Sequence, residues 1–314
     1  DYGHSLAGNT YWFDRSVNFA VPKKPVPGAL VTYQQLGPNS VGGVRSLIVD
    51  RADEEGRFRF DIMRNRLTNT IKAYEVDDET GAITSAPDWG QEGHETYPME
   101  HPWGWWENEM LQVLFECQPL SLFETVDSRY LSVLDYVTVL DDRDGVLQQW
   151  GAEYVEDQST EEGKVTMAAV VFAPAGSRVK VLMSTGLFGV PYLLSGAPKE
   201  WLKEPLSVET MSESLLERAY GNGYAVDQGT LLRPAFAAAR DMWILDDARI
   251  KQLARYGVRN GKFMRLHEDA RTALLDASAH FEGRRYAKYK AAVREAWGLE
   301  TRGYPDIKST AEDT

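Results

Sequence analysis

Short runs of alternating apolar and polar residues, separated by acidic turns that contain glycine, fill much of the first third of this chain. The runs lie at residues 29–33, 57–60 and 71–76, and the turns lie at 53–56 and 77–81. Alternation with a period of two is typical of half-buried β-strands, and Asp and Gly favour the tight turns that join antiparallel strands. The sequence therefore predicts an antiparallel β-sandwich within residues 10–100, with Phe58 and Phe60 on its inner face and the 53–56 turn exposed.

Two further regions follow, and the second has a different periodicity. Strand-like runs continue over residues 110–194, with a hairpin predicted around the turn at 174–177. Beyond Pro234, apolar residues recur every three or four positions, which indicates amphipathic helices. Pro234 favours the first turn of a helix that ends near Tyr256, and the last of three helices is expected to stop before Pro305.

The expected fold class is therefore α+β, with an N-terminal antiparallel β-sandwich, a second β-rich region and a C-terminal helical hairpin or bundle. A chain of 314 residues has room for this division, because single hydrophobic cores stop growing near ~250–300 residues. The expected boundaries are 1–105 for the sandwich, 106–200 for the second β-rich region, 201–230 for a connector and 231–314 for the helices.

Charge argues against one class of partner and suggests another. The net charge of −13 disfavours nucleic acid, which selects basic proteins. The segment 249–294 nevertheless holds 12 Lys and Arg against four Asp and Glu, so it carries +8 while the rest carries −21. A basic helical end of this kind suits an anionic lipid surface or an acidic partner, and a solvated helix surface is the alternative. The candidate membrane-facing residues are Arg284, Arg285, Lys288 and Lys290.

Metal and redox chemistry have little support in the sequence. Cys117 is the only cysteine, so neither an intrachain disulfide nor a cysteine-based zinc site can form. His94, Glu95 and His101 form the best cluster of possible ligands, but they lack the spacing that places two histidines on one helix face. The acidic turns lack the spacing of a calcium-binding helix-loop-helix, and turn formation explains their composition. We therefore expect no structural metal and no cofactor.

Catalytic motifs are equally scarce. No nucleophile elbow, phosphate-binding loop or dinucleotide-binding glycine pattern occurs in the chain. The 47 acidic residues always offer carboxylate pairs, so a hydrolase with dispersed carboxylates stays open as an alternative. The sequence favours a protein that is not an enzyme.

Three tryptophans around a glycine form a second candidate site. Trp103, Trp105 and Trp106 would present a flat aromatic surface of the kind that holds sugar rings or peptides. The alternative is that these rings stabilise the joint between the two β-rich regions. The first interpretation predicts a carbohydrate- or peptide-binding module.

The N-terminal region resembles the carboxypeptidase regulatory-like domain, a small transthyretin-like β-sandwich. The resemblance rests on Pro-Val-Pro-Gly-Ala-Leu-Val-Thr-Tyr at 25–33, the aspartate-rich turn, Gly-Arg-Phe-Arg-Phe at 56–60 and the Ala-Tyr strand at 73–74. Domains of this family usually accompany a larger protein and have no catalytic role. The resemblance implies an accessory region.

Four passages elsewhere resemble the extracytoplasmic part of bacterial membrane proteins related to FtsX-type permeases of ABC transporters. They are Asp127-Ser-Arg-Tyr-Leu-Ser-Val-Leu-Asp-Tyr136, Gly176-Ser-Arg-Val-Lys-Val-Leu-Met183, Ala239-Arg-Asp-Met-Trp-Ile-Leu-Asp246 and Ala296-Trp-Gly-Leu-Glu-Thr-Arg-Gly-Tyr-Pro-Asp306. In that group a hydrophobic segment follows the Tyr-Pro-Asp-x-Lys motif, and the resemblance implies the same here.

This second resemblance carries expectations about function and context, and it implies no catalytic residues. It implies a non-catalytic, extracytoplasmic domain (periplasmic or at the cell surface) that is attached to the membrane and mediates contact with a ligand or partner. The implied partners are the membrane-embedded remainder of the same protein or a transporter subunit, with a carbohydrate or peptide as possible ligand.

Overall fold

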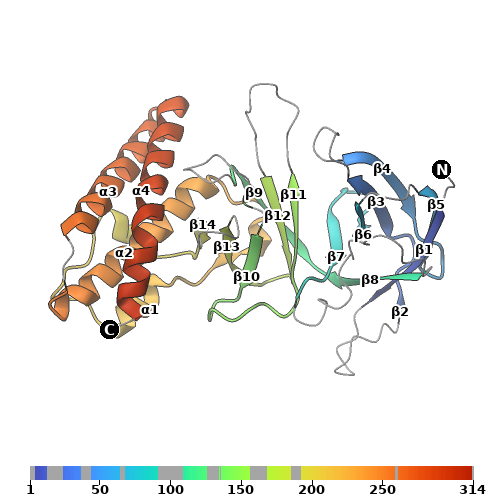
Figure 1. The fold of residues 1–314 in the computed structure, drawn as a ribbon, viewed down its shortest axis with the longest axis horizontal. Helices are drawn as coiled ribbons and strands as arrows, with labels where there is room; N and C mark the ends of the chain where they lie inside the picture. The colour runs from blue at the N-terminus through green and yellow to red at the C-terminus, as the bar shows by residue number, and fades with distance from the viewer. Residues whose placement is uncertain are drawn as a thin grey trace.

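A computed structural model describes residues 4–12, 24–36, 44–63, 68–90, 109–125, 134, 136–155, 168–184, 192–258 and 261–312. The fold class is α+β, as predicted: β-sheets occupy the N-terminal and middle parts and helices occupy the C-terminal part. These parts follow one another along the long axis of the molecule (Figure 1), so that β1 and α4 lie at opposite ends.

The first part is one curled sheet of eight strands. Its strands are β1 (His4–Trp12), β2 (Lys24–Pro25), β3 (Leu30–Leu36), β4 (Val44–Arg51), β5 (Arg57–Met63), β6 (Thr68–Val76), β7 (Ile83–Pro87) and β8 (Glu109–Glu116). The order is β2-β1-β8-β7-β6-β3-β4, and β5 pairs with β1. All pairs are antiparallel except β1 and β8, which run parallel with Ala7 opposite Glu109. The strand β8 thus belongs to this sheet, although the expected boundary at residue 105 places it in the second region.

The curled sheet encloses an apolar core built from the alternating runs. Phe58 and Phe60 on β5 are 4% and 3% exposed, and they pack with Val31 and Tyr33 from β3. The turn that precedes β5 is exposed from residue 53 to residue 55. The prediction for the two rings is therefore confirmed, whereas the turn is exposed except at Gly56, which is buried.

The acidic turns are held by their own carboxylates. Asp53 Oδ1 accepts hydrogen bonds from the backbone N–H groups of Glu55 and Arg57 at 3.0 and 2.8 Å. Asp77 Oδ1 accepts from the backbone N–H and the hydroxyl of Thr80, both at 2.7 Å. A carboxylate used in this way accepts hydrogen bonds from backbone N–H groups of the turn that have no partner in a neighbouring strand.

Two smaller sheets form the middle of the molecule. One has the order β11 (Gly151–Val155), β12 (Ala168–Ala173) and β9 (Gln118–Phe123). The other has the order β10 (Tyr136–Leu140), β13 (Arg178–Ser184) and β14 (Tyr192–Leu194), with β15 (Tyr224–Ala225) also paired to β13. The predicted hairpin around residues 174–177 is wrong, because β12 is paired on both edges by β11 and β9 and the turn leads into the other sheet.

A joint connects the first sheet to the middle of the molecule. The ring centroids of Trp89 and Trp150 lie 5.8 Å apart in an edge-to-face arrangement. Lys72 Nζ lies 2.6 Å from Glu153 Oε2, and the Tyr74 hydroxyl donates to the other oxygen of the same carboxylate. Strand β6 of the first sheet is thereby tied to β11.

The helical part contains α1 (Glu213–Ala219), α2 (Pro234–Arg255), α3 (Gly261–Glu282) and α4 (Tyr286–Glu312). Helix α2 begins at Pro234 and ends before Gly257, which has a φ of +82°, as the sequence predicts. Every residue of α2 from Pro234 to Arg249 is buried, so α2 is the central helix of this part. None of the described helices combines the length and apolarity needed to cross a lipid bilayer.

The predicted end of the last helix is wrong. Helix α4 continues through Gly303 and Pro305 to Glu312. A proline removes one backbone hydrogen bond from a helix, but tertiary packing outweighs such local preferences. Trp297, Tyr304 and Ile307 are buried along this stretch, and that burial keeps the chain helical across the proline.

Candidate functional site

A cavity of about 720 Å³ lies among the three long helices. It is bounded by the C-terminal half of α2, the N-terminal half of α3 and the end of α4, with Pro205 and Val208 from the segment before α1. Most of its wall is apolar. The apolar residues of the wall include Ile250, Leu253, Ala254, Phe263, Met264 and Ile307 from the helices and Val258 from the segment after α2.

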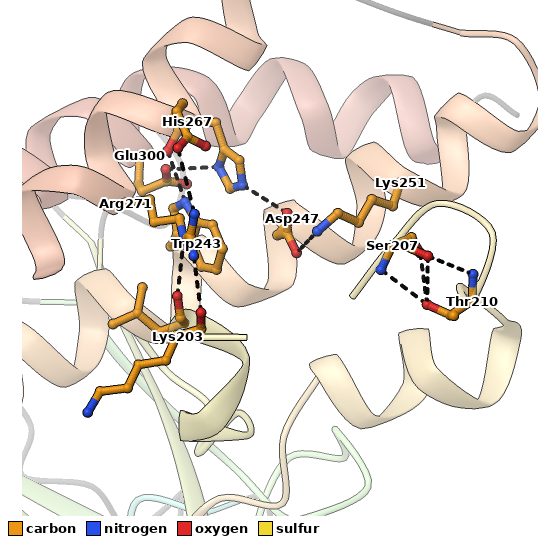
Figure 2. Close-up of polar contacts among 11 residues, drawn as sticks. Lys203, Ser207, Thr210, Trp243, Asp247, Lys251, His267, Arg271 and Glu300 are labelled. Atoms are coloured by element: carbon orange, nitrogen blue, oxygen red, sulfur yellow. Dashed lines mark hydrogen bonds and ion pairs between the residues drawn. The ribbon is translucent and has the colours of Figure 1, made fainter. Parts of the chain in front are cut away.

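The polar end of this cavity is organised around His267 on α3. Its ring stacks on Trp243 of α2 with centroids 4.7 Å apart and 4° between the planes. Trp243 Nε1–H donates to the carbonyl oxygen of His267 at 2.9 Å. His267 Nδ1 lies 3.1 Å from Glu300 Oε1 on α4, and Nε2 lies 3.5 Å from Asp247 Oδ1 on α2. Figure 2 shows the imidazole held between the two carboxylates.

These two carboxylates determine the charge of the ring. Burial alone would lower the pKa of His267, but the charges of Glu300 and Asp247 outweigh burial and raise the pKa to about 10. His267 is therefore an imidazolium at neutral pH, with both ring nitrogens as donors. Nδ1–H donates to Glu300, and the buried Nε2 forms an ion pair with Asp247 Oδ1 at 3.5 Å.

Two further cations border the same cavity, and each has a partner. Lys251 on α2 donates to Asp247 Oδ2, one helical turn away. Arg271 on α3 donates to the carbonyl oxygens of Leu202 and Lys203 at 3.1 and 3.2 Å, which ties the helices to the segment before α1 (Figure 2). A four-residue turn in that segment is closed by reciprocal hydrogen bonds between Ser207 and Thr210 (Figure 2).

A second buried acid lies beside this group. Asp246 is fully buried, and burial followed by the neighbouring charge of Glu300 raises its pKa well above the ordinary value. Arg249, 3.5 Å from Asp246, opposes that shift but does not cancel it. The raised pKa favours the protonated form of Asp246 beside the Glu300 side chain.

The charge of the imidazole limits the proton transfers that this arrangement can perform. An imidazolium with a pKa of about 10 has no lone pair to accept a proton at neutral pH, so His267 is a poor general base. Its charge is balanced by Glu300, and the charge of Lys251 is balanced by Asp247. Among the residues described, no group of three His, Cys, Asp or Glu side chains could hold a metal ion.

None of the site residues predicted from the sequence is among the described residues that line this cavity. Trp103, Trp105, Trp106, His94, Glu95 and His101 lie outside the described residues. Arg284, Arg285 and Lys288 are exposed where α3 connects to α4. Lys290 pairs with Glu124 at 2.6 Å and so contacts the protein itself. Cys117 is buried, and burial raises the pKa of its thiol to about 12.

Sequence reasoning missed the residues of the cavity. Asp246 and Asp247 lie in a largely apolar helical stretch that also contains Arg240 and Asp241, and charged pairs in a central helix indicate internal partners. That signal was available, but the positions of His267 and Glu300 opposite this pair depend on how three helices pack. Local sequence patterns do not specify such packing.

Comparison with known proteins adds little. No family model matches the chain, and no curated protein matches it. Among solved structures, "The fimbrial anchor protein Mfa2 from Porphyromonas gingivalis" is similar over 57% of this chain and 78% of that chain, with 11% sequence identity and a TM-score of 0.19. Mfa2 is a fimbrial anchor protein, and a likeness at this TM-score carries no argument about the fold or function of the present chain.

Proposed function

We propose that this chain is a non-catalytic binding protein whose helical part holds a small ligand in the cavity beside His267. The observation that supports this proposal is that a mostly apolar wall is combined with a polar end at which His267 and Asp247 are buried. Its volume of about 720 Å³ falls in the range of roughly 300–1,000 Å³ that is usual for small-molecule sites. The charged imidazole and the paired cations can form polar contacts with a ligand, but none of them acts as a nucleophile or a base.

We further propose that the binding event takes place outside the cytoplasm, in a region attached to a bacterial membrane protein of the transporter-permease type. This proposal is supported by the sequence resemblance alone. In that setting, ligand binding in the cavity would change how the chain contacts the membrane-embedded remainder or a transporter subunit. Arg284, Arg285 and Lys288 remain candidates for contact with anionic lipid because they are exposed and basic.

The test of the binding proposal is to fill the cavity. Ala254 lines the cavity and is only partly buried, so Ala254→Phe would occupy the space with little strain. A neutral apolar fluorescent probe, N-phenyl-1-naphthylamine, is titrated into the wild type and the variant. Saturable binding to one site should be lost in the variant, with the unfolding midpoint of the protein unchanged.

The matched control is Ala287→Phe, the same substitution at an exposed position of α4 that does not line the cavity. This control should bind the probe as the wild type does. Equal probe binding by wild type and Ala254→Phe would place the bound probe elsewhere and contradict the proposal.

A further inference from the structure

Three exposed apolar side chains lie where the end of β9, the start of α2 and the start of α4 meet. They are Phe123, Leu232 and Tyr286, which are 47%, 79% and 55% exposed. No other large apolar side chain in the described part of the chain is as exposed as Leu232. Single exposed apolar residues are common on protein surfaces, whereas a group of them marks an interaction site.

Backbone pairing places the first two of these side chains together. The segment before α2 runs parallel to β9, with Thr230 opposite Ser121. The Leu231 N–H donates to the carbonyl oxygen of Ser121 at 3.1 Å. Two residues beyond this bridge, the parallel segments reach Leu232 on one side and Phe123 on the other.

The start of α4 is connected to both of these segments. Lys290 on α4 pairs with Glu124, directly after β9, at 2.6 Å. The guanidinium group of Arg233, directly before α2, lies 4.3 Å from the centroid of the Phe281 ring. That ring in turn lies 5.9 Å from the Tyr286 ring in an edge-to-face arrangement. The three elements therefore present one continuous surface.

The same surface is basic. Four exposed basic residues lie beside the apolar group, namely Arg233, Arg284, Arg285 and Lys288. Two of them come directly before Tyr286, and one follows it by two positions. With the exposed Glu282 included, the group carries +3, in a chain whose net charge is −13.

The turns that present these residues have an unfavourable backbone conformation. Four non-glycine residues in the described part of the chain have a positive φ. Three of them lie at this surface, namely Glu124, Arg233 and Arg284, with φ of 60°, 61° and 55°. Side chains other than glycine rarely adopt this conformation, because Cβ comes too close to a backbone oxygen. Such residues cluster at functional sites, which supports a functional role for this surface.

We propose that this surface docks on an anionic lipid bilayer, with Phe123, Leu232 and Tyr286 inserted among the headgroups and the basic residues beside the lipid phosphates. Apolar side chains flanked by Lys and Arg are typical of proteins that bind at the membrane interface. The acidic remainder of the chain is repelled by such a bilayer, so only this surface would face it. The inference deepens the lipid contact proposed above by adding apolar insertion, and it does not depend on the cavity.

The test measures whether residue 232 enters the membrane. Leu232→Cys is labelled with a polarity-sensitive nitrobenzoxadiazole fluorophore. The natural Cys117 is buried and its thiol has a pKa of about 12, so it should not react at pH 7. Vesicles that contain phosphatidylserine should bind the labelled chain and shift the emission to shorter wavelength. Vesicles of phosphatidylcholine alone should do neither.

The matched control is the same label at Leu47→Cys. Leu47 is 55% exposed on β4, in the first sheet at the other end of the molecule (Figure 1). Its label should keep the same emission when the chain binds the anionic vesicles. An equal shift at both positions would mean that insertion does not select this surface, and would overturn the inference.

Two variants separate the apolar contribution from the electrostatic one. Leu232→Ser should weaken binding to the anionic vesicles about tenfold, because one inserted leucine is lost, without changing the salt dependence. Replacing Arg284 and Arg285 with Gln should weaken binding about twentyfold and reduce the salt dependence, because each basic residue near the surface contributes about fivefold. Leu47→Ser should bind as the wild type does.

The remaining outcomes distinguish this inference from the proposed lipid contact. Binding to anionic vesicles without an emission shift at residue 232 would overturn insertion and leave the electrostatic contact standing. No binding to anionic vesicles, even at low salt, would overturn both. Binding of soluble polyglutamate as tight as that of the vesicles, again without a shift, would assign the surface to an acidic protein and overturn the inference.

Discussion

Two fully buried aspartates on α2, five positions apart, have opposite surroundings. Asp241 Oδ2 accepts hydrogen bonds from the backbone N–H groups of Ser195 and Gly196 at 3.0 and 2.8 Å and from the Tyr224 hydroxyl at 2.7 Å. Its other oxygen accepts from Arg240 at 2.7 Å. Asp246 instead lies beside the Glu300 carboxyl group, and burial together with Glu300 raises its pKa well above the ordinary value despite the opposing charge of Arg249. Asp241 therefore stabilises the folded protein, whereas Asp246 destabilises it.

Asparagine should therefore have opposite effects at the two positions. Asp246→Asn removes a carboxyl whose raised folded-state pKa lowers stability at every pH above its unfolded value. The free energy of unfolding at pH 7 should rise by roughly 1–3 kcal/mol. Asp241→Asn leaves the buried Arg240 without its counter-charge and should lower that free energy by about 3–5 kcal/mol. Urea unfolding of both variants measures these changes in the free energy of unfolding. A similar decrease in that free energy for both variants would contradict this account.

His267 should make the protein less stable in alkaline solution. Its folded-state pKa of about 10 exceeds the ordinary value of 6.5, so its stabilising contribution is complete below pH 6.5 and is lost as the pH rises through 10. The free energy of unfolding should fall by at most about 1.4 kcal/mol per pH unit over this window on account of this group. Urea unfolding between pH 6 and pH 10.5 measures the slope.

The slope should be assigned by comparing variants, because the raised folded-state pKa of Asp246 also makes stability fall as the pH rises above its ordinary value. His267→Gln should flatten the curve between pH 7 and pH 10. His280→Gln, at another histidine of α3, is the variant for comparison. A wild-type slope that persists in His267→Gln would show that the imidazole is not its source.

At the scale of single elements, β5 shows how one strand supports the first sheet. Phe60 lies 5.6 Å from the Tyr33 ring and 5.9 Å from the Phe58 ring, measured between centroids. Phe60→Ala should lower the free energy of unfolding by about 3–5 kcal/mol, because it leaves a cavity in this core. Arg59→Ala, on the solvent side of the same strand, loses only an exposed pair with Asp61 and should change it by less than about 1 kcal/mol.

Elements were predictable from the sequence where a local pattern decides them. The alternation around Phe58 and Phe60 predicts a half-buried strand, and Pro234 with Gly257 predicts the limits of α2. Pairing between strands was not predictable in the same way, since β12 and β13 are adjacent in sequence yet lie in different sheets. Helix α4 continues through Pro305 because the packing of buried side chains outweighs the local tendency of proline to end a helix. The cavity was hidden for the same reason, because its polar end combines residues from three helices.

At the scale of the whole molecule, the joint between the first and middle sheets depends on two close backbone approaches. A Cβ at Gly90 would lie 1.8 Å from the carbonyl oxygen of Gln148, and one at Gly151 would lie 2.7 Å from that of Pro87. No side chain can be accommodated at the first position without moving the backbone. The two sheets are therefore in contact through main chain as well as through Trp89 and Trp150.

Gly90→Ala should therefore separate the sheets at the joint. We expect the free energy of unfolding to fall by about 1–3 kcal/mol or more, and protease cleavage between the two sheets to become faster. Gly261→Ala is the matched control, since a Cβ there meets nothing within 4 Å. Small-angle scattering should show a larger radius of gyration for the first variant only. An unchanged cleavage pattern would mean that the side-chain contacts alone maintain the joint.

The parallel pairing of β1 with β8 has a mechanical consequence. The ladder runs from Ala7 opposite Glu109 to Trp12 opposite Leu114, and β8 leads through Cys117 into β9 of the middle part. A pull on the start of β1 against the rest of the molecule drags the two strands in opposite directions along their length. Such a pull shears all the rungs at once, whereas a hairpin pulled from its open end unzips one rung at a time. Tension entering at β1 would therefore meet its greatest resistance in the first sheet, before it reaches the helices.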